Sequence, residues 1–302
     1  MEQSLIASAK TRRFSWSHLF GHLVLIGGGL VFIYPLLFML LASLFTSQEY
    51  MSRPISLFPI AQEPSLKNLL QTFSTGTSSL LQTFAVNSIL RAVYYTLWAV
   101  LTSFLAGYVF SRLKFRWREG LFMLLISSQM IPQFVGVLPT YLELAYWPFT
   151  GGKGILDTPW VYIVLNGGAV NIMGMFIVKQ SMEKLPYELD EAAKMDGAGP
   201  LRLIFQIILP LQKPILAYVA ITSFIYVWND WGTPFFYTNS ESLQTLASGL
   251  SRLTAFSSAF SGTPDYPFMM TLSLLLTIPC VVIFFFFQKL IVQGLANTGI
   301  KG

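Results

Sequence analysis

The chain has 302 residues, of which 54% are hydrophobic and only 11% are charged, and its formal net charge is +5. Because a soluble domain carries about 25% charged residues, this composition excludes an ordinary soluble protein and indicates an integral membrane protein. Cys280 is the single cysteine and lies inside an apolar run. Because there is only one cysteine, disulfides within the chain and cysteine-ligated metal clusters are excluded.

Six apolar segments are long enough to cross ~30 Å of hydrocarbon as helices. In chain order, we predict membrane spans at Leu19–Leu44, Val86–Phe110, Leu121–Tyr141, Trp160–Val178, Ile215–Trp231 and Phe268–Leu290. The connecting segments 45–85 and 232–267 are too short for separate domains, and no internal repeat is evident. We therefore expect an all-α integral membrane fold in which residues 1–302 form a single transmembrane domain.

Basic residues determine the orientation of these spans, because they gather on the cytoplasmic side. One side carries Lys10, Arg12, Arg13, Arg112, Lys114, Arg116, Arg118, Lys179, Lys184, Lys194, Arg202, Lys213, Lys289 and Lys301. The other side carries only Arg53, Lys67, Lys153 and Arg252. This asymmetry predicts that residues 1–18, the loop 179–214 and the C-terminus are cytoplasmic, and that 45–85 and 232–267 are external. It also explains the positive net charge without a nucleic-acid partner.

The loop before the fifth span predicts two short helices around a tight turn. Pro186 suits the first position of a helix, and the acidic residues that follow it favour the helix dipole. Ala192 and Ala193 leave a small-residue face that another surface can approach closely. Gly197 stands where a helix C-terminus favours positive φ. This pattern favours a docking site for a partner, and the alternative is an amphipathic connector on the membrane surface.

The second helix of this loop is expected to begin at Pro200. Leu201, Ile204, Phe205 and Ile208 follow at helical spacing. Pro210 and Pro214 are expected to end this helix before the fifth span, because an interior proline lacks the backbone donor and crowds the preceding turn.

The spacing of three elements in this loop resembles the EAA signature of ABC importer permeases. These elements are Glu191-Ala192-Ala193, then Gly197, then Ile207-x-Leu209-Pro210. The form Asp196-Gly197-Ala198 is typical of the sugar-importing branch. Further matches to the maltose-type second permease are Asn87-Ser88, Trp228-Asn229-Asp230 and the closing Lys301-Gly302. The resemblance implies a type I ABC importer transmembrane domain in a binding-protein-dependent carbohydrate importer.

The resemblance also implies the partners and their contact residues. A coupling helix would sit in a groove of a separate ATPase, with the contact formed by Glu191, Ala192, Ala193, Asp196, Gly197, Ala198, Leu209 and Pro210. The complex would contain a homologous second permease, two copies of the ATPase and an extracytoplasmic solute-binding protein. It would import a sugar or oligosaccharide across a bacterial or archaeal plasma membrane. The C-terminal tail, residues 297–302, would also reach the ATPase pair.

The chain itself lacks the motifs of an enzyme. No GxxxxGK[ST] phosphate loop occurs, since Gly151-Gly152-Lys153-Gly154 lacks that spacing. We therefore expect no cofactor in this chain, with ATP and Mg²⁺ bound by the partner ATPase. No set of catalytic side chains is evident, so we expect a transport subunit. His18 and His22 lie four residues apart without a further ligand nearby, so no metal site is expected.

Polar residues inside membrane spans are costly and usually face a cavity or another helix. We predict a substrate path through Gln129, Asn166, Asn171, Trp228, Asn229, Asp230 and Trp231. Amides and carboxylates bond to sugar hydroxyls, and aromatic faces stack on sugar rings. The alternative for each residue is a structural hydrogen bond between helices. Arg91, inside the second span, is a candidate charge partner for a neighbouring helix.

Three other classes of protein are alternatives to a sugar importer. An ABC importer permease for a non-sugar solute would share the EAA signature. An ion-coupled secondary transporter predicts acidic relays or inverted repeats inside the membrane, and neither is evident. A membrane-embedded enzyme predicts a cluster of carboxylates near one interface, which the sequence also lacks.

Overall fold

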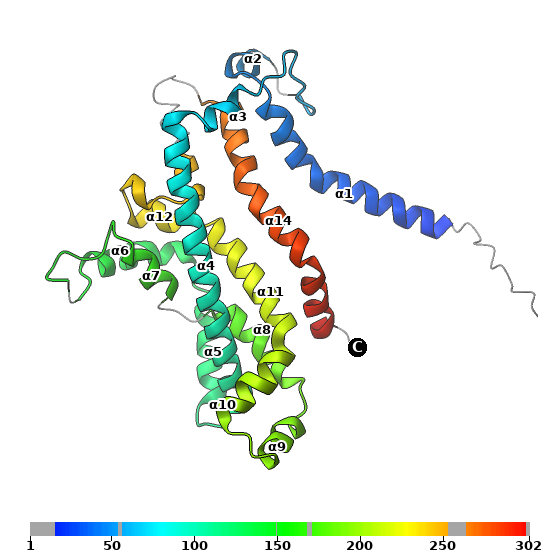
Figure 1. Ribbon diagram of the computed structural model, residues 1–302, viewed down its shortest axis with the longest axis vertical. Helices are drawn as coiled ribbons and strands as arrows, with labels where there is room; N and C mark the ends of the chain where they lie inside the picture. The colour runs from blue at the N-terminus through cyan, green and yellow to red at the C-terminus, as the bar shows by residue number, and fades with distance from the viewer. Residues whose placement is uncertain (1–15, 54–55, 149, 168–170, 253–263, 300–302) are drawn as a thin grey trace, which may run out of the picture. The chain divides into compact units, whose positions relative to one another are not determined.

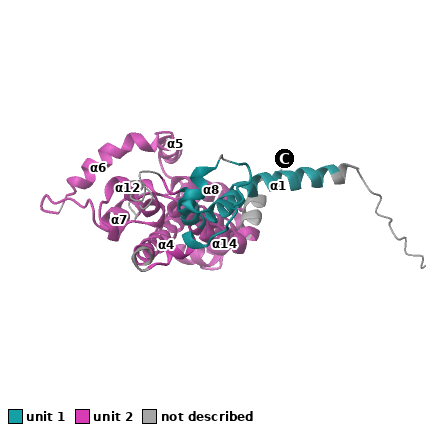
Figure 2. Ribbon diagram, turned by 90° about the horizontal axis from the view of Figure 1, so that it is seen from above, with its two compact units in different colours: residues 1–68, 266–274 teal, residues 69–265, 275–302 magenta. Residues whose placement is uncertain are grey.

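The computed structural model describes residues 16–53, 56–148, 150–167, 171–252 and 264–299, and the regular structure within these ranges is helical throughout (Figure 1). The predicted N-terminal segment is therefore described only from residue 16, and residues 300–302 of the predicted ATPase-facing tail lie outside the described part. The chain divides into two compact units, residues 1–68 with 266–274 and residues 69–265 with 275–302 (Figure 2). The expectation of a single domain stays a prediction.

The first unit contains α1 (Trp16–Ser43) and α2 (Ser47–Ser52). The end of α1 is fixed by Asn68, whose side-chain amide donates to the carbonyl oxygens of Ser43 and Phe45, both at 2.8 Å. Asn68 lies in α3 (Lys67–Thr72). The first turns of α14 (Tyr266–Gly299) also belong to this unit. The buried amide satisfies carbonyl groups that a helix end leaves without partners.

The second unit is built around α4 (Thr75–Arg112), which packs against α8 (Ile172–Glu183) and α11 (Leu209–Trp228). At Gly107 the two backbones of α4 and α8 come close together. A Cβ atom at this position would lie 2.6 Å from Val178 Cγ1, so only glycine fits without a shift. The three helices enclose a core that includes Phe104, Val178 and Val219.

Four described helices are long and apolar enough to cross a membrane: Phe20–Ser43, Ser79–Arg112, Pro200–Trp228 and Tyr266–Lys289. The third predicted span is divided into α5 (Arg118–Ser128), η1 (Gln133–Gly136) and α6 (Val137–Ala145), with a 90° bend at the break. Pro132 lies at this break. Because proline has no backbone N–H to donate, it interrupts the hydrogen bonding of a helix. With this bent pair the candidates number up to five.

The fourth predicted span, Trp160–Val178, is also divided. It consists of α7 (Trp160–Gly167) and the first part of α8. The side chain of Asn171 accepts a hydrogen bond from Gly174 N at 2.9 Å and so caps a new helix inside the apolar run. Residues 168–170 between the two helices lie outside the described part. The all-α membrane fold is confirmed, whereas the number of six spans is not.

The expected break at Pro210 and Pro214 is wrong. Helix continues from Pro200 to Trp228 through α10 (Pro200–Arg202), η2 (Leu203–Ile208) and α11. The segment η2 is a π-helix in which the Leu209 amide bonds to the Ile204 carbonyl. This widened turn, placed just before Pro210, relieves the crowding between the proline ring and the preceding turn. The fifth span and the second helix of the loop are therefore one element.

Candidate functional site

The EAA hairpin, defined as residues 186–210, begins with α9 (Glu188–Met195). Its turn has the hydrogen bonds of a Schellman motif: Gly197 N donates to Lys194 O at 3.0 Å, and Ala198 N donates to Ala193 O at 2.9 Å. Gly197 has φ +77°, which confirms the expected positive φ. Pro186 lies two residues before α9 rather than at its first position, and Glu188 begins the helix.

The EAA hairpin has an exposed side and a buried side. Glu191, Ala192, Asp196 and Gly197 are exposed, as is Pro210. In contrast, Ala193 is 5% exposed and packs into the core, where the half-buried Ala198 and Leu209 also lie. The predicted small-residue face is therefore divided, with one alanine facing outward and the other inward.

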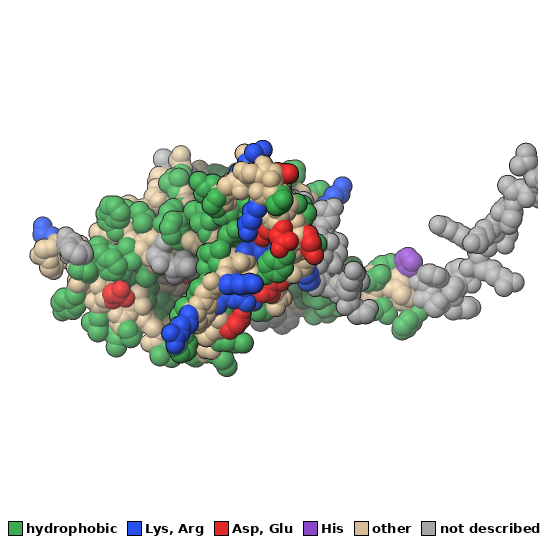
Figure 3. All heavy atoms as spheres, turned by 90° about the horizontal axis from the view of Figure 1, so that it is seen from below, with side chains coloured by type: hydrophobic (Ala, Val, Ile, Leu, Met, Phe, Trp, Pro, Cys, Tyr) green, Lys and Arg blue, Asp and Glu red, His purple; other side chains and the backbone are tan. Residues whose placement is uncertain are grey.

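Figure 3, which views the lower end of Figure 1, shows acidic and basic side chains gathered on this face. The exposed members on α9 and the following turns are Glu188, Glu191, Lys194, Asp196 and Arg202. A surface of this kind offers several sites for charge-assisted hydrogen bonds to a partner.

The buried side of the hairpin is held to the end of α4 by Arg112. The Arg112 Nε atom lies 3.5 Å from Asp190 Oδ2, and the two side chains are 2% and 10% exposed. Arg112 Nη2 donates to the carbonyl of Leu185 at 3.0 Å, and the guanidinium lies 4.4 Å from the centre of the Tyr187 ring. Tyr187 in turn donates its hydroxyl to the Ser111 carbonyl at 3.0 Å. Sequence reasoning treated Asp190 only as a helix-dipole residue and did not pair it with Arg112.

This inner ion pair is incompletely hydrogen-bonded. Among the described residues, Arg112 Nε and Nη1 and Asp190 Oδ1 are buried without a hydrogen-bond partner. The 3.5 Å separation satisfies charge attraction but is long for a charge-assisted hydrogen bond. Because unpaired buried polar atoms are costly, the contact between α4 and α9 is weaker than the charges alone suggest.

A cavity of about 410 Å³ lies between α4, α8 and α11 with the bend after α5. Three of the predicted substrate-path residues line it, namely Gln129, Asn166 and Asn171. Asn171 donates its side-chain amide to Ser223 Oγ at 3.1 Å. The aromatic and hydroxyl side chains of the wall, which the sequence did not identify, are Tyr95, Trp98, Tyr218, Thr222, Ser223 and Tyr226. A signal for them exists in the sequence, because Tyr218, Thr222 and Tyr226 recur every four residues and therefore share one helix face.

The other four predicted path residues lie outside this wall. Trp228 is buried and donates Nε1 to the Leu276 carbonyl at 3.0 Å. Asn229 donates to the Ile225 carbonyl at 2.8 Å, and Trp231 packs edge-on against Phe235. These contacts are structural hydrogen bonds and ring packing, the alternative that the sequence left open.

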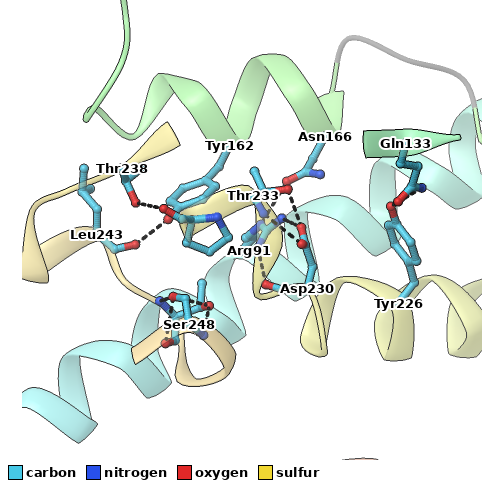
Figure 4. Close-up of polar contacts among 12 residues, drawn as sticks. Arg91, Gln133, Tyr162, Asn166, Tyr226, Asp230, Thr233, Thr238, Leu243 and Ser248 are labelled. Carbon is cyan, nitrogen blue, oxygen red and sulfur yellow. Dashed lines mark hydrogen bonds and ion pairs between the residues drawn. The ribbon is translucent and has the colours of Figure 1, made fainter. Parts of the chain in front are cut away.

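Arg91 forms an ion pair with Asp230, which lies between α11 and α12, so the expectation that Arg91 has a charge partner outside its own helix is confirmed (Figure 4). Arg91 also donates Nε to Asn166 Oδ1 at 3.0 Å and lies over the Tyr162 ring at 4.9 Å. Asp230 accepts further hydrogen bonds from Thr233 N at 3.0 Å and Thr233 Oγ1 at 2.6 Å. This outer pair joins α4, α7, the end of α11 and α12 (Gly232–Tyr237).

A second carboxylate organises the segment that follows α12. Asp157 accepts hydrogen bonds from Asn239 N at 2.7 Å, Ser240 N at 2.8 Å and Ser240 Oγ at 2.6 Å. Desolvation raises the pKa of Asp157, but the hydrogen bonds from Ser240 and Asn239, with the charge of Arg252, outweigh it and hold this pKa below its ordinary value. Its ionised form therefore stabilises the local structure.

An all-helical membrane fold with an EAA hairpin and a polar cavity defines a permease. Residues 99–297 match the family described as "Binding-protein-dependent transport system inner membrane component", and the chain belongs to this family. The chain is 30% identical over 298 residues to the galactooligosaccharides transport system permease protein GanQ of Bacillus subtilis (strain 168), covering 99% of this chain and 100% of that protein.

Two further proteins illustrate the range of relatives. The sn-glycerol-3-phosphate transport system permease protein UgpE of Brucella abortus (strain 2308) is 29% identical over 287 residues, covering 93% of this chain and 97% of that protein. A solved structure of a bacterial ABC transporter involved in the import of the acidic polysaccharide alginate has a TM-score of 0.69 at 20% identity. It covers 91% of this chain and 98% of the matched chain, which confirms the importer fold.

Proposed function

We propose that this chain is the translocation subunit of an ATP-driven importer for a sugar or oligosaccharide. It pairs with a homologous permease, two copies of an ATPase that bind ATP and Mg²⁺, and an extracytoplasmic solute-binding protein. The observation that carries this proposal is the EAA hairpin, which presents Glu191, Ala192 and Gly197 outward while Asp190 and Ala193 of α9 are buried against the other helices. The sugar class is supported by the galactooligosaccharide relative.

The hairpin is connected to two of the helices that wall the cavity, α4 and α11. Arg112 links α9 to the end of α4, which carries Tyr95 and Trp98 on the cavity wall. Continuous helix links the second half of the hairpin to α11, which carries Thr222 and Tyr226. A movement of α9 driven by closure of the ATPase pair would therefore move both walls, as rigid-body coupling requires. In this mechanism the loop 179–214 and both termini are cytoplasmic.

The proposal is tested by co-expressing the chain with the products of its genomic neighbours and purifying it through an affinity tag. We expect an ATPase to co-purify, and the reconstituted complex to accumulate a sugar in vesicles only with ATP and the binding protein. The proposal is wrong if no ATPase co-purifies, or if uptake follows an ion gradient without ATP.

A further inference from the structure

The cavity wall combines amides, hydroxyls and aromatic rings. Gln129, Gln133, Thr222 and Tyr226 are exposed to solvent on this wall, and Gln133 Nε2 lies 3.3 Å from the Tyr226 hydroxyl (Figure 4). Amide and hydroxyl groups can both donate and accept hydrogen bonds, which matches the chemistry of a polyol. The volume of about 410 Å³ falls within the range of roughly 300–1,000 Å³ for ligand pockets.

Formal charge is missing from this wall. Among the described residues that line the cavity, there is no Asp, Glu, Lys, Arg or His. Arg91 contacts the wall through its Nε atom, which donates a hydrogen bond to Asn166 Oδ1. Its charge is compensated by Asp230, and its guanidinium is occupied by Asp230, Asn166 and the Tyr162 ring. The network therefore supplies an oriented amide to the cavity without a net charge.

The relatives differ in the charge of their named solutes. Galactooligosaccharides are uncharged, whereas sn-glycerol-3-phosphate and alginate are anionic. An anion moved from water into a cavity between membrane helices loses hydration that only an opposite charge or several aligned donors can replace. A wall of neutral amides and hydroxyls replaces the hydrogen bonds of sugar hydroxyls but gives no countercharge.

We infer that this cavity selects an uncharged, hydroxyl-rich solute, and that the wall formed by α4, α11 and the bend after α5 discriminates against carboxylate or phosphate groups. The inference rests on the proposed function and narrows its substrate class to neutral saccharides. The side chains that set this preference are Gln129, Gln133, Thr222 and Tyr226, because they are the exposed polar groups of the wall.

The test uses the reconstituted full complex and pairs of oligosaccharides that differ only in one primary alcohol oxidised to a carboxylate. Binding to the solute-binding protein is measured separately, and only pairs that it binds with similar affinity are compared. For the wild-type chain, we expect ATP-driven uptake of the neutral member to exceed that of the carboxylate by at least about tenfold, because the carboxylate lacks a countercharge in the cavity.

Four variants test whether the wall sets this preference. Gln129→Lys places a cation in the cavity and should move the uptake ratio toward the carboxylate by at least about tenfold. Gln129→Met has similar length and adds no charge, so it controls for loss of the amide and should not raise uptake of the carboxylate member. Gln71→Lys adds the same charge at an exposed position outside the cavity and should not change the ratio. Thr222→Lys provides a second site if the first variant does not assemble.

The outcomes distinguish failure of the inference on charge from failure of the proposed function. Equal uptake of both members by the wild-type chain, or an unchanged ratio in both lysine variants of the wall, would overturn the inference on charge while leaving the importer function standing. Absence of ATP-driven uptake for every solute would overturn the proposed function and the inference with it.

Discussion

Two arginines of α4 each form an ion pair with an aspartate, and the two pairs differ in how completely they are hydrogen-bonded. Arg91 and Asp230 form the outer pair, and Asn166 and Thr233 supply further bonds to it. The inner pair between Arg112 and Asp190 is 3.5 Å apart and leaves buried polar atoms on both partners without hydrogen bonds among the described residues. The Arg91–Asp230 pair is supported by hydrogen bonds from neighbouring side chains, whereas the Arg112–Asp190 pair contains buried polar atoms without a partner among the described residues.

The spacing of the two arginines explains their tolerance in an apolar helix. A rise of about 1.5 Å per residue puts Arg91 and Arg112 about 32 Å apart along α4, close to the ~30 Å thickness of the hydrocarbon core. We therefore expect each arginine to lie toward one membrane interface, where a charge costs less than at the centre. The Arg91 end of α4 is held by more hydrogen bonds than the Arg112 end, which joins the hairpin.

The largest expected effect comes from breaking the outer pair. Arg91→Met leaves the Asp230 carboxylate without its partner and should lower the free energy of unfolding by about 3–5 kcal/mol. The midpoint of thermal unfolding of the purified complex measures this loss. The double variant Arg91→Met with Asp230→Asn should recover part of the stability, because the uncompensated charge is gone. A double variant no more stable than the single one would contradict this account of the pair.

A smaller loss is expected at the inner pair. Arg112→Met should cost about 1–3 kcal/mol, since it removes one carbonyl hydrogen bond and an ion pair that is already incomplete. The same unfolding measurement on Asp190→Asn gives a matched comparison from the other partner. If Arg112→Met lowers the free energy of unfolding as much as Arg91→Met does, the two pairs contribute equally to stability, which contradicts the difference in their hydrogen bonding.

The turn of the hairpin gives a third test through backbone strain alone. A Cβ atom at Gly197 meets nothing within 4 Å, but the residue has φ +77°. Gly197→Val should therefore cost at least about 1–2 kcal/mol from the left-handed conformation and should weaken coupling between hydrolysis and uptake. Gly199→Val is the control, because Gly199 has equally open space and φ −70°. If both variants change uptake equally, the positive φ of Gly197 is not what coupling between hydrolysis and uptake requires.

The smallest expected effect is a pH dependence at Asp157. Its pKa is lowered in the folded chain, so the stability it contributes is present above the ordinary pKa of an aspartate and is lost as the pH falls through the lowered value. The difference in unfolding midpoint between the wild-type chain and Asp157→Asn should narrow when the pH is lowered from about 7 to about 3. A difference that stays constant over this range would exclude the assigned role of the carboxylate.

The sequence predicts the hairpin better than the cavity. The positive φ of Gly197 follows from local backbone sterics, and the charge partner of Arg91 follows from the cost of an unpaired charge in a membrane. The uninterrupted helix through Pro210 was not predicted, because the π-helix that accommodates it depends on packing rather than on residue type. The cap at Asn171, which divides the fourth predicted span, was also missed.

Residues of the cavity wall were only partly predicted for a different reason. Polarity selected Gln129, Asn166 and Asn171, which line the cavity, but it also selected Trp228 and Asn229, whose polar groups bond to nearby carbonyls. A polar side chain in a span satisfies the same sequence pattern in both situations. Only the three-dimensional contacts distinguish a residue that faces the cavity from one that joins two helices.

The ratio of solute transported to ATP hydrolysed distinguishes the roles proposed for the two pairs, in which the inner pair transmits movement while the outer pair holds the fold. Vesicles containing the full complex would be compared with Arg112→Met or Arg91→Met, each corrected for the amount of assembled complex. We predict that Arg112→Met lowers the ratio while hydrolysis continues, and that Arg91→Met reduces assembled complex but leaves the ratio unchanged. An equal fall of the ratio in both variants, or no fall in Arg112→Met, would contradict this account.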